Sequence, residues 1–400
     1  MRNDFLLIAV LLAGLIGMSS SCTKEKPVVE DEPPIPPETI DFVHGIDLSY
    51  VKQVEDKGGV FKLDQNNIDP FKLFKDKGAN MVRLRLWHNP EWIKDIYGDQ
   101  TAVYSGFEEV AIDIKRAKDN GMAVNLDFHY SDIWADPEHQ TPPSAWMDIT
   151  DINVLCDSVY NYTYGVMKEL HERNILPEMV QIGNETNCGM MHTGTMNAFP
   201  KLSVCDGNWI NMGKVLNAGI KAVRDVDMLS GKSTLVALHV ADPKNLDWWF
   251  TNIINQGQVT DFDIAGFSYY HIWHTTVSFF DLPDVVISLK AKINRDVVIL
   301  ETAYPFTTDN NDSYNNIYGS QAPLAAYPYS VEGQKQYMID LTQNMMEAGA
   351  IGVMYWEPAW ITSGLKDLWG TGSAWENCAL FDFSGKATDG INYLNHPFTN

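Results

Sequence analysis

The chain has 400 residues, of which 45% are hydrophobic and 20% are charged, a composition typical of a globular protein rather than a disordered one. The formal net charge of −23 argues against nucleic acid or an anionic membrane surface as a partner. A strongly acidic polymer would be repelled as well, which favours a neutral one.

The N-terminus is predicted to direct export. After a short, weakly positive start, residues 5–17 form an apolar stretch that is too short to cross a membrane. Residues 19–22 (Ser-Ser-Ser-Cys) then resemble the cleavage site of a bacterial lipoprotein signal. We therefore expect a signal peptide over residues 1–21 and a lipid on the thiol of Cys22. A plain secretory signal with an incidental cysteine is the alternative, because Ser19 stands where leucine is usual.

Residues 22–40 are rich in Pro, Glu, Asp and Lys, and such a segment cannot bury a core. We expect a flexible tether here and one folded catalytic domain over residues 41–400. Lys24 and Glu25 resemble the charged signals that send some lipoproteins to the outer face of the outer membrane, so we expect a cell-surface location. We also expect a monomer.

Strand and helix patterns alternate from residue 41 onward. Eight buried-strand patterns are predicted, at residues 42–49, 81–86, 123–130, 179–183, 235–240, 263–270, 297–302 and 351–356. Helical patterns lie between them, among others at residues 68–78, 107–121, 152–174, 209–226 and 333–349, and several end at Gly or Asn. Eight such repeats predict a single (β/α)8 TIM barrel. A doubly wound sheet is the alternative, but no glycine-rich phosphate loop follows the first strand.

Carboxylates stand at the ends of two of these strands. Glu185 follows the strand at 179–183 directly after Asn184, and Glu301 ends the strand at 297–302. Active sites of TIM barrels lie at this end of the strands, and glycoside hydrolysis needs two carboxylic acids on either side of the scissile bond. A single loop-end glutamate is more often a cap, but two acids on two strand ends favour a glycosidase. Glu185 would be the proton donor, which requires a raised pKa, and Glu301 would be the ionised nucleophile.

Other strand ends supply groups that could serve this pair. Asn184 could bond the sugar 2-hydroxyl, Arg83 and Tyr270 could donate to Glu301, and His129 could fix the acceptor geometry. A cation beside Glu301 would lower its pKa. The chain has 12 Trp, and aromatic rings often stack on sugars, although each of these residues could equally belong to the core.

Long ordered segments of the chain resemble glycoside hydrolase family 53, the endo-β-1,4-galactanases (arabinogalactan endo-1,4-β-galactosidases). The matching segments are 45-GIDLSYV-51, 79-ANMVRLRLWHNP-90, 125-NLDFHYSDIWADPEHQTPPSAW-146, 180-VQIGNET-186, 266-GFSYYHIWH-274, 298-VILETAYPF-306, 355-YWEPAW-360 and 379-ALFDFSG-385. The resemblance implies a retaining barrel enzyme with Glu185 as acid/base and Glu301 as nucleophile. It places the conserved arginine, histidine and tryptophan of the clan on Arg83, His129 and Trp356. The matching segments also contain Trp87 and Asp132, which we expect to bind substrate or to support the site.

Bacterial relatives in this family often hold a structural Ca²⁺ in the loop after the seventh strand, with an acidic pattern. Here that loop reads 307-TTDNNDSYNN-316, and the resemblance places ligands on Asn310, Asp312 and Asn316. Asn310 replaces an acid and Tyr314 replaces a histidine, which weakens the site. Asp309 in a shifted register or Asp367 could compensate, and a polar loop without metal is the alternative.

Four cysteines remain besides Cys22, namely Cys156, Cys188, Cys205 and Cys378. Cys188 and Cys205 flank one loop, which favours this pair as a disulfide in an exported protein. No C-x-x-C motif supports a zinc site.

The favoured function is hydrolysis of β-1,4-galactan, or type I arabinogalactan, in pectin. Another β-glycanase of the same clan, such as a mannanase or xylanase, would use the same chemistry. A non-catalytic glycan-binding protein on a barrel scaffold is the third reading, disfavoured because both glutamates are present.

Overall fold

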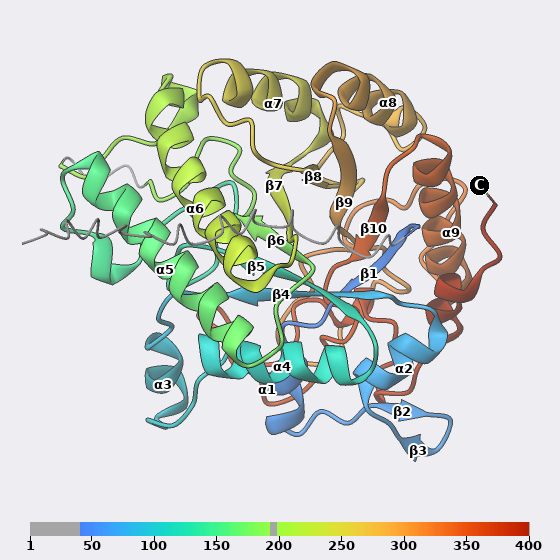
Figure 1. Cartoon of the computed structure of the whole chain (residues 1–400). Coiled ribbons are helices and arrows are strands. Elements are labelled where there is room, and N and C mark those ends of the chain that lie inside the picture. The colour runs from blue at the N-terminus through green and yellow to red at the C-terminus, as the bar shows by residue number, and fades with distance from the viewer. Residues whose placement is uncertain (1–40, 193–197, 400) are drawn as a thin grey trace, which may run out of the picture. The chain divides into compact units, whose positions relative to one another are not determined.

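The structure, a computed structural model, describes residues 41–192 and 198–399. In these residues eight parallel strands close into a barrel, each pairing with the next along the chain until the last returns to the first (Figure 1). They are β1 (Val43–Asp47), β4 (Met81–Leu86), β5 (Ala123–Phe128), β6 (Met179–Ile182), β7 (Leu235–Ala241), β8 (Ile264–Ser268), β9 (Asp296–Thr302) and β10 (Gly352–Tyr355). The predicted (β/α)8 barrel is confirmed, and the doubly wound sheet was the wrong alternative. The expected signal peptide and tether lie outside the described residues.

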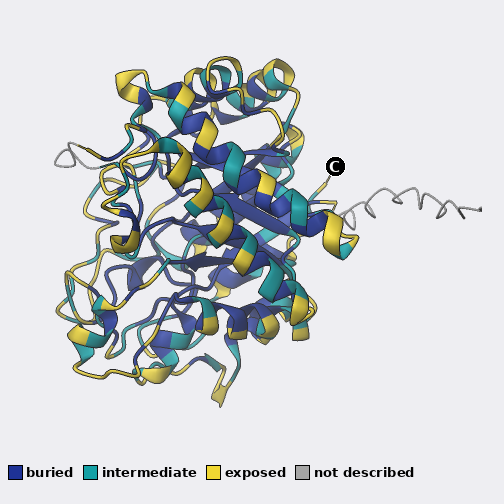
Figure 2. Cartoon of the chain, turned by 60° about the vertical axis from the view of Figure 1, so that its left-hand side comes forward, coloured by how far each residue is buried: buried dark blue, intermediate teal, exposed yellow. Residues whose placement is uncertain are grey.

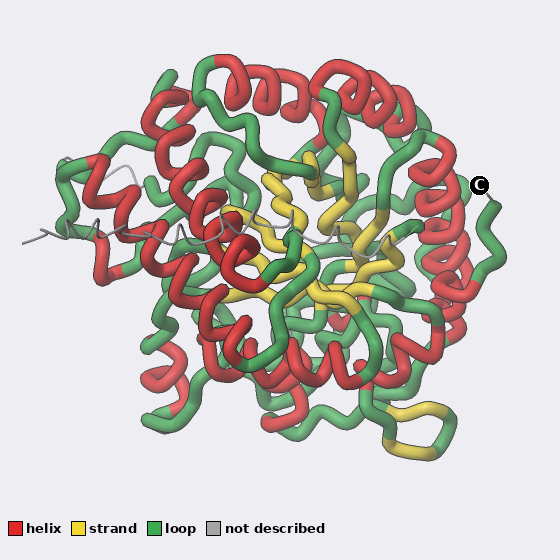
Figure 3. The backbone as a smooth tube through the Cα atoms, in the orientation of Figure 1, coloured by secondary structure: helices red, strands yellow, loops and turns green. Residues whose placement is uncertain are grey.

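Helices form the outer layer around the strands, as Figure 3 shows. They are α2 (Pro70–Lys77), α4 (Phe107–Asp119), α5 (Ile152–Glu172), α6 (Trp209–Ser230), α7 (Leu246–Asn255), α8 (Leu282–Ile293) and α9 (Val331–Glu347), with α1 (Val51–Asp56) and α3 (Trp92–Tyr97) as short additions and a small hairpin, β2 (Lys62–Leu63) and β3 (Asn66–Asn67). Figure 2 shows the barrel strands mostly buried and the helices buried along their inner faces. Within the described part of the chain, no helix has the length and apolar character needed to cross a membrane.

The helix boundaries follow from capping chemistry in the sequence. Asp69 precedes α2, and its side chain accepts a hydrogen bond from the Phe71 N–H at 2.8 Å while Pro70 occupies the first turn. Ser330 begins α9 in the same way by accepting from Gly333 N–H at 3.0 Å. Gly78 ends α2 with φ 114°, a left-handed conformation that favours glycine. These local signals explain why the predicted helices lie within a few residues of the observed ones.

Apolar side chains fill the barrel interior near the ends where most strands begin. We call this group the apolar layer: Val43, Met81, Met179, Ala237, Ile264, Val298, Leu300 and Met354. Two glycines make room for its largest members. A Cβ on Gly45 would lie 2.3 Å from Met354 Cγ, and one on Gly266 would lie 2.2 Å from Leu300 Cδ1. The sizes of residues on neighbouring strands are therefore matched across this layer.

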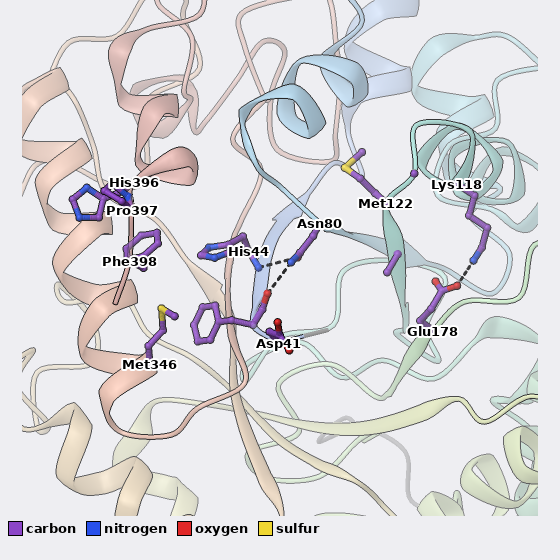
Figure 4. A pocket seen from close by; sticks show the side chains of 13 residues that line it. Asp41, His44, Asn80, Lys118, Met122, Glu178, Met346, His396, Pro397 and Phe398 are labelled. Carbon is purple, nitrogen blue, oxygen red and sulfur yellow. Dashed lines mark hydrogen bonds and ion pairs between the residues drawn. The ribbon is translucent and has the colours of Figure 1, made fainter. Parts of the chain in front are cut away.

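A cavity of about 850 Å³ lies at the same end of the barrel (Figure 4). Its lining includes Asn80 and Glu178, which directly precede β4 and β6, and Phe398 near the C-terminus. Lys118 also lines the cavity and forms an ion pair with Glu178, with Nζ 2.6 Å from Oε1. In TIM barrels this end of the strands serves stability, and the predicted carboxylates stand at the opposite end.

Candidate active site

The two predicted carboxylates face each other at the carboxyl end of the barrel. Glu301 belongs to β9, and Glu185 follows β6. One carboxylate oxygen of each lies within 4.8 Å of the other, and His239 of β7 places a ring nitrogen within the same distance of both. Glu185 is 8% exposed and Glu301 6%, so both carboxyl groups are largely removed from water.

A tight turn after β6 brings Glu185 into the barrel mouth. Gly183 has φ 87° and Glu185 has φ 45°, so two residues of this turn adopt a left-handed backbone conformation. A left-handed φ is uncommon for a residue with a side chain, and such strain often marks a functional position. The Thr186 N–H donates to His239 O at 2.9 Å and fixes the turn against β7.

Arg83 organises the buried charges beneath the two glutamates. Its Nη1 lies 2.8 Å from Glu301 Oε1 and 2.9 Å from Asp47 Oδ2, and its Nη2 lies 2.7 Å from Asp127 Oδ2. Arg83 is 1% exposed, so one guanidinium serves three buried carboxylates in a setting of low dielectric. We call the group of buried polar side chains connected around Arg83 and Glu185 the polar layer: Asp47, Arg83, Asp127, Gln181, Asn184, Glu185, His239, Ser268 and Glu301.

Glu301 receives both of the donors that the sequence suggested. Besides Arg83, the Tyr270 hydroxyl donates to Glu301 Oε2 at 3.1 Å. Burial nevertheless raises the pKa of Glu301 to about 7, because the loss of hydration outweighs the opposing effect of the Arg83 charge. The neighbouring cation thus lowers the pKa of Glu301 as expected, but by less than burial raises it.

Glu185 lies in a different environment. Burial, followed by the nearby charge of Glu301, raises the pKa of Glu185 well above its ordinary value. Its Oε1 lies 2.5 Å from Ser268 Oγ, and Ser268 Oγ lies 2.9 Å from His239 Nε2. Glu301 has the cation of Arg83 at 2.8 Å and the Tyr270 hydroxyl as donors, whereas no ion pair among the described residues involves Glu185, so when the pair holds one proton, that proton resides on Glu185.

Asn184 is held firmly beside Glu185. Its Oδ1 accepts from Arg83 Nη2 at 2.8 Å and from Gln181 Nε2 at 2.9 Å, and its Nδ2 donates to Ala135 O at 2.7 Å. These contacts set the amide orientation, because an arginine can only donate. They use one of the two Nδ2 hydrogens, which leaves the other for a ligand.

His129 does not reach Glu301. Its Nε2 lies 3.0 Å from Asp127 Oδ2, and its Nδ1 accepts from the Ala135 N–H at 3.1 Å. His129 therefore acts on the site indirectly, by orienting Asp127 under Arg83 and by holding the loop after β5.

Aromatic rings surround the mouth. Trp356 is half-buried, and its ring centroid lies 4.8 Å from that of Trp375 and 5.8 Å from that of Trp134. Trp273 is 43% exposed and completes the group. Trp87, in contrast, is 1% exposed and covers the guanidinium of Arg85 at 4.6 Å. Of the two predicted tryptophans, Trp356 is accessible to a sugar, whereas Trp87 supports the site from within.

Comparison with known proteins decides the family. The model of glycosyl hydrolase family 53 matches residues 43–394, which is nearly the whole described barrel. The chain belongs to glycosyl hydrolase family 53. It is 42% identical over 347 residues to an arabinogalactan endo-beta-1,4-galactanase of Cellvibrio japonicus, covering 86% of this chain and 88% of that one. It is 31% identical over 381 residues to an endo-beta-1,4-galactanase of Bacillus subtilis, covering 86% and 83%.

Solved structures agree with this assignment. The family 53 catalytic domain of Ignisphaera aggregans superimposes with a TM-score of 0.78 at 31% identity, covering 92% of this chain and 99% of that one. A fungal beta-1,4-galactanase gives a TM-score of 0.74 at 28% identity, covering 88% and 98%. The protein is therefore a glycoside hydrolase on a (β/α)8 barrel.

The loop predicted to hold Ca²⁺ in this family 53 enzyme is closed by its own hydrogen bonds. Asp312 Oδ1 accepts from the Tyr314 N–H at 2.7 Å, and Asp312 Oδ2 accepts from the Ser373 N–H at 2.9 Å. Asn310 Oδ1 accepts from Asn316 N–H and Nδ2, both at 2.8 Å. The predicted ligands thus lie together in one loop, and each of these side-chain oxygens already accepts a hydrogen bond.

Buried acidity nevertheless gathers at this loop. Glu376 is 1% exposed, and burial raises its pKa, with a further contribution from the charge of Asp312. No ion pair involves either carboxylate within residues 41–192 and 198–399. Asp367 also contacts this loop, because it accepts from the Tyr314 hydroxyl at 2.9 Å. Oxygen ligands with unbalanced negative charge suit Ca²⁺, so the residues fit a weak site.

Two further predicted features have structural roles. Asp132 accepts from the Asn89 N–H at 3.0 Å and from Ser144 N–H at 2.8 Å, so it ties two loops of the mouth together. Cys188 and Cys205 form the favoured disulfide. Cys156 and Cys378 are free.

Sequence reasoning missed His239 and Ser268, which contact Glu185 and its neighbours. His239 interrupts the apolar strand 235-LVALHVA-241, and a lone histidine there is indistinguishable from a core residue. The available signal is the alternation of β strands: the side chain of His239 points to the same face as Ala237 of the apolar layer, and therefore into the barrel.

Proposed function

We propose that this family 53 enzyme is a retaining endo-β-1,4-galactanase that cleaves β-1,4-galactan and the type I arabinogalactan side chains of pectin. The observation that carries the proposal is that one carboxylate oxygen of Glu185 lies within 4.8 Å of one carboxylate oxygen of Glu301. Retaining glycosidases hold their carboxyl groups about 5–5.5 Å apart, whereas inverting enzymes need about 6.5–9.5 Å to admit a water molecule. The similarity to galactanases of Cellvibrio japonicus and Bacillus subtilis supports galactan as the polymer.

In the first step, a carboxylate oxygen of Glu301 forms a bond to the anomeric carbon, and the bond from that carbon to the leaving sugar breaks. The electron pair goes to the glycosidic oxygen, which takes the proton of Glu185. Glu301 suits the nucleophile because Arg83 and Tyr270 donate to its two oxygens and orient them. Glu185 suits the acid because it holds the more tightly bound proton of the pair.

In the second step, Glu185 removes a proton from water, and the water oxygen bonds to the anomeric carbon. The bond to Glu301 breaks, which returns both carboxyl groups to their first state with the anomeric configuration retained. In this proposal the second Nδ2 hydrogen of Asn184 bonds the sugar 2-hydroxyl, a contact that strengthens in the transition state.

Release of reducing ends from β-1,4-galactan, β-mannan and xylan tests the substrate. We expect release from galactan, its loss in Glu185→Ala and Glu301→Ala, and a β-anomer as the first product by proton NMR. Strong release from mannan or xylan instead would overturn the substrate, and an α-anomer would overturn the retaining mechanism. Galactan binding by the wild type with no cleavage of any polymer would make it a glycan-binding protein.

We further propose that the protein is exported and anchored by a lipid on Cys22, facing the cell surface. The support is the lipoprotein-like sequence at residues 19–22 and the polar segment that follows it. The test is fractionation of wild type and Cys22→Ser with protease treatment of intact cells. Wild type is expected in the membrane fraction and degraded by external protease, and the variant is expected in the soluble fraction. Identical fractionation of both would contradict the anchor.

We also propose a weak structural Ca²⁺ in the loop of Asn310, Asp312 and Asn316, supported by the unbalanced charge of Asp312 and Glu376. A bound ion would hold several oxygens of this loop together, and the loop contacts the segment after β10 through Asp312 and Ser373. EDTA is then expected to lower the Tm by a few degrees and Ca²⁺ to restore it, with Asp312→Asn insensitive to both. An equal Tm with EDTA and with millimolar Ca²⁺ would refute the site.

A further inference from the structure

A buried row of hydrogen bonds runs from Glu185 through Ser268 and His239 to Asn184, and its geometry determines which atom carries each proton. The orientation of the Asn184 amide can be assigned first. Arg83 Nη2 donates to Asn184 Oδ1 at 2.8 Å, so the atom of Asn184 that faces His239 must be an oxygen. His239 Nδ1 lies 2.8 Å from this oxygen, and two acceptors at that distance would repel each other. His239 Nδ1 therefore carries a hydrogen.

Two donors also lie near His239 Nδ1, but neither changes this assignment. Gln181 Nε2 is 3.0 Å away, and its two hydrogens point to acceptors at Gly183 O and Asn184 Oδ1, at 3.1 Å and 2.9 Å. The Glu185 backbone N–H is the longer contact, at 3.4 Å. The contact with Asn184 is the shortest, so it sets the tautomer.

His239 is 0% exposed, and burial holds its pKa well below its ordinary value, so the ring is neutral. With the hydrogen on Nδ1, Nε2 is an acceptor. Ser268 Oγ lies 2.9 Å from Nε2 and must donate its only hydrogen there. Ser268 then offers lone pairs to Glu185 Oε1 at 2.5 Å, and a hydrogen bond in that direction needs a proton on Glu185.

We propose that Ser268 and His239 are positioning residues that hold the acidic proton on Glu185 until the leaving group takes it. The inference rests on the proposed role of Glu185 as acid/base. Once Glu185 is ionised, its oxygen faces a hydroxyl oxygen turned the wrong way, which disfavours the ionised form. Ionising Glu185 therefore costs more than burial alone would require.

Other charged and titratable groups also face this row of hydrogen bonds and are the same in a variant at Ser268. They come from β4, β5, the loop after β5, the loop after β8, and β9: Arg83, Asp127, His129, Asp136, Tyr270, His274 and Glu301. Removing only the Ser268 hydroxyl therefore isolates its contribution to the proton affinity of Glu185.

The test is the pH dependence of kcat/KM on β-1,4-galactan for wild type, Ser268→Ala and Ser268→Thr. Ser268→Ala is expected to move the alkaline limb to lower pH by about one unit and to leave the acidic limb, which belongs to Glu301, in place. Ser268→Thr keeps the hydroxyl and is expected to restore the alkaline limb. Thr163→Ala removes a buried hydroxyl of α5 that bonds Tyr130, and serves as the matched control with an unchanged profile.

A substrate with an activated leaving group distinguishes a loss of proton donation by Glu185 from a general structural defect of the variant. On a dinitrophenyl β-1,4-galactobioside, which needs no protonation, Ser268→Ala is expected to lose several-fold less activity than on galactan. An unmoved alkaline limb, or equal losses on both substrates, would overturn the inference. Glu185→Gln distinguishes the larger failure: if it cleaves galactan as wild type does, the proposed function itself is wrong.

Discussion

The two halves of the barrel interior are built on opposite principles. The apolar layer is filled by close-packed side chains and contains no ionisable group. The polar layer, a few residues further along the same strands, buries one guanidinium among carboxylates, amides and a histidine. Both layers are almost inaccessible to water, so burial alone does not distinguish them.

The difference teaches where this chain concentrates its stability and where it accepts a cost. Burying apolar surface is favourable, whereas burying a charge is repaid only by well-placed partners. The polar layer meets that condition through Arg83, whose two terminal nitrogens contact Asp47, Asp127 and Glu301. A barrel kept only for stability would have no need of such an arrangement.

The largest expected effect comes from changing the polar layer without changing its shape. Glu301→Gln should lower kcat/KM on galactan on the order of 10⁴- to 10⁶-fold, because an amide cannot form the covalent intermediate. Thermal unfolding should change little, since the amide oxygen can still accept from Arg83 while the amide NH2 can donate to the Tyr270 hydroxyl oxygen. Reducing-end assays and Tm measure the two effects, with the exposed Glu332→Gln as control. Residual activity within tenfold of wild type would contradict the assignment.

Removing the cation that the three carboxylates share should lower both the folding free energy and the activity. Arg83→Met leaves Asp47, Asp127 and Glu301 buried without a counter-charge and should cost about 3–5 kcal/mol of folding free energy at pH 7. It should also abolish most activity, because Glu301 and Asn184 lose their orientation. Urea unfolding gives the free energy. A loss under 1 kcal/mol would show that these carboxylates are already protonated in the native state.

A change in the apolar layer should lower stability and leave activity nearly unchanged, the opposite of Glu301→Gln. Leu300→Ala leaves a cavity beside Gly266 and should cost about 2–5 kcal/mol of folding free energy. At temperatures where the variant remains folded, kcat/KM should stay within a few-fold of wild type. Leu229→Ala on the surface of α6, where the side chain is 53% exposed, is the matched control and should be nearly neutral. A large catalytic loss in folded Leu300→Ala would mean that the two layers are coupled.

The smallest effect is a pH dependence of stability. Folding raises the pKa of Glu301 from 4.5 to about 7, so the native state binds its proton more tightly than the unfolded state. The stability this provides is complete below the unfolded pKa of 4.5 and is lost as pH rises through about 7. Glu301→Gln removes this contribution. The Tm difference between variant and wild type should therefore grow in favour of the variant over that window, and a constant difference would contradict the raised pKa.

The strands, the barrel and the positions of both glutamates could be read from the sequence, because apolar runs end in polar residues at each strand terminus. Contacts across the barrel could not. Neither the 2.5 Å contact of Ser268 with Glu185 nor the sharing of Arg83 follows from spacing along the chain. Trp87 and Trp356 both stand at strand ends, yet one is buried over Arg85 and the other lines the mouth. Closure of the barrel decides which side chains meet.

Because Glu301 lies close to Glu185, its charge can change the proton affinity of Glu185 between the two steps of the reaction. The charge of Glu301 helps to keep the proton on its neighbour, and that charge disappears when the carboxylate becomes an ester in the proposed intermediate. The pKa of Glu185 then falls, which favours its ionised form. That form is the one that can remove a proton from water in the second step. Hydrolysis of the ester restores the charge and readies the enzyme for the next turnover, so each covalent event prepares the protonation state that the following step requires.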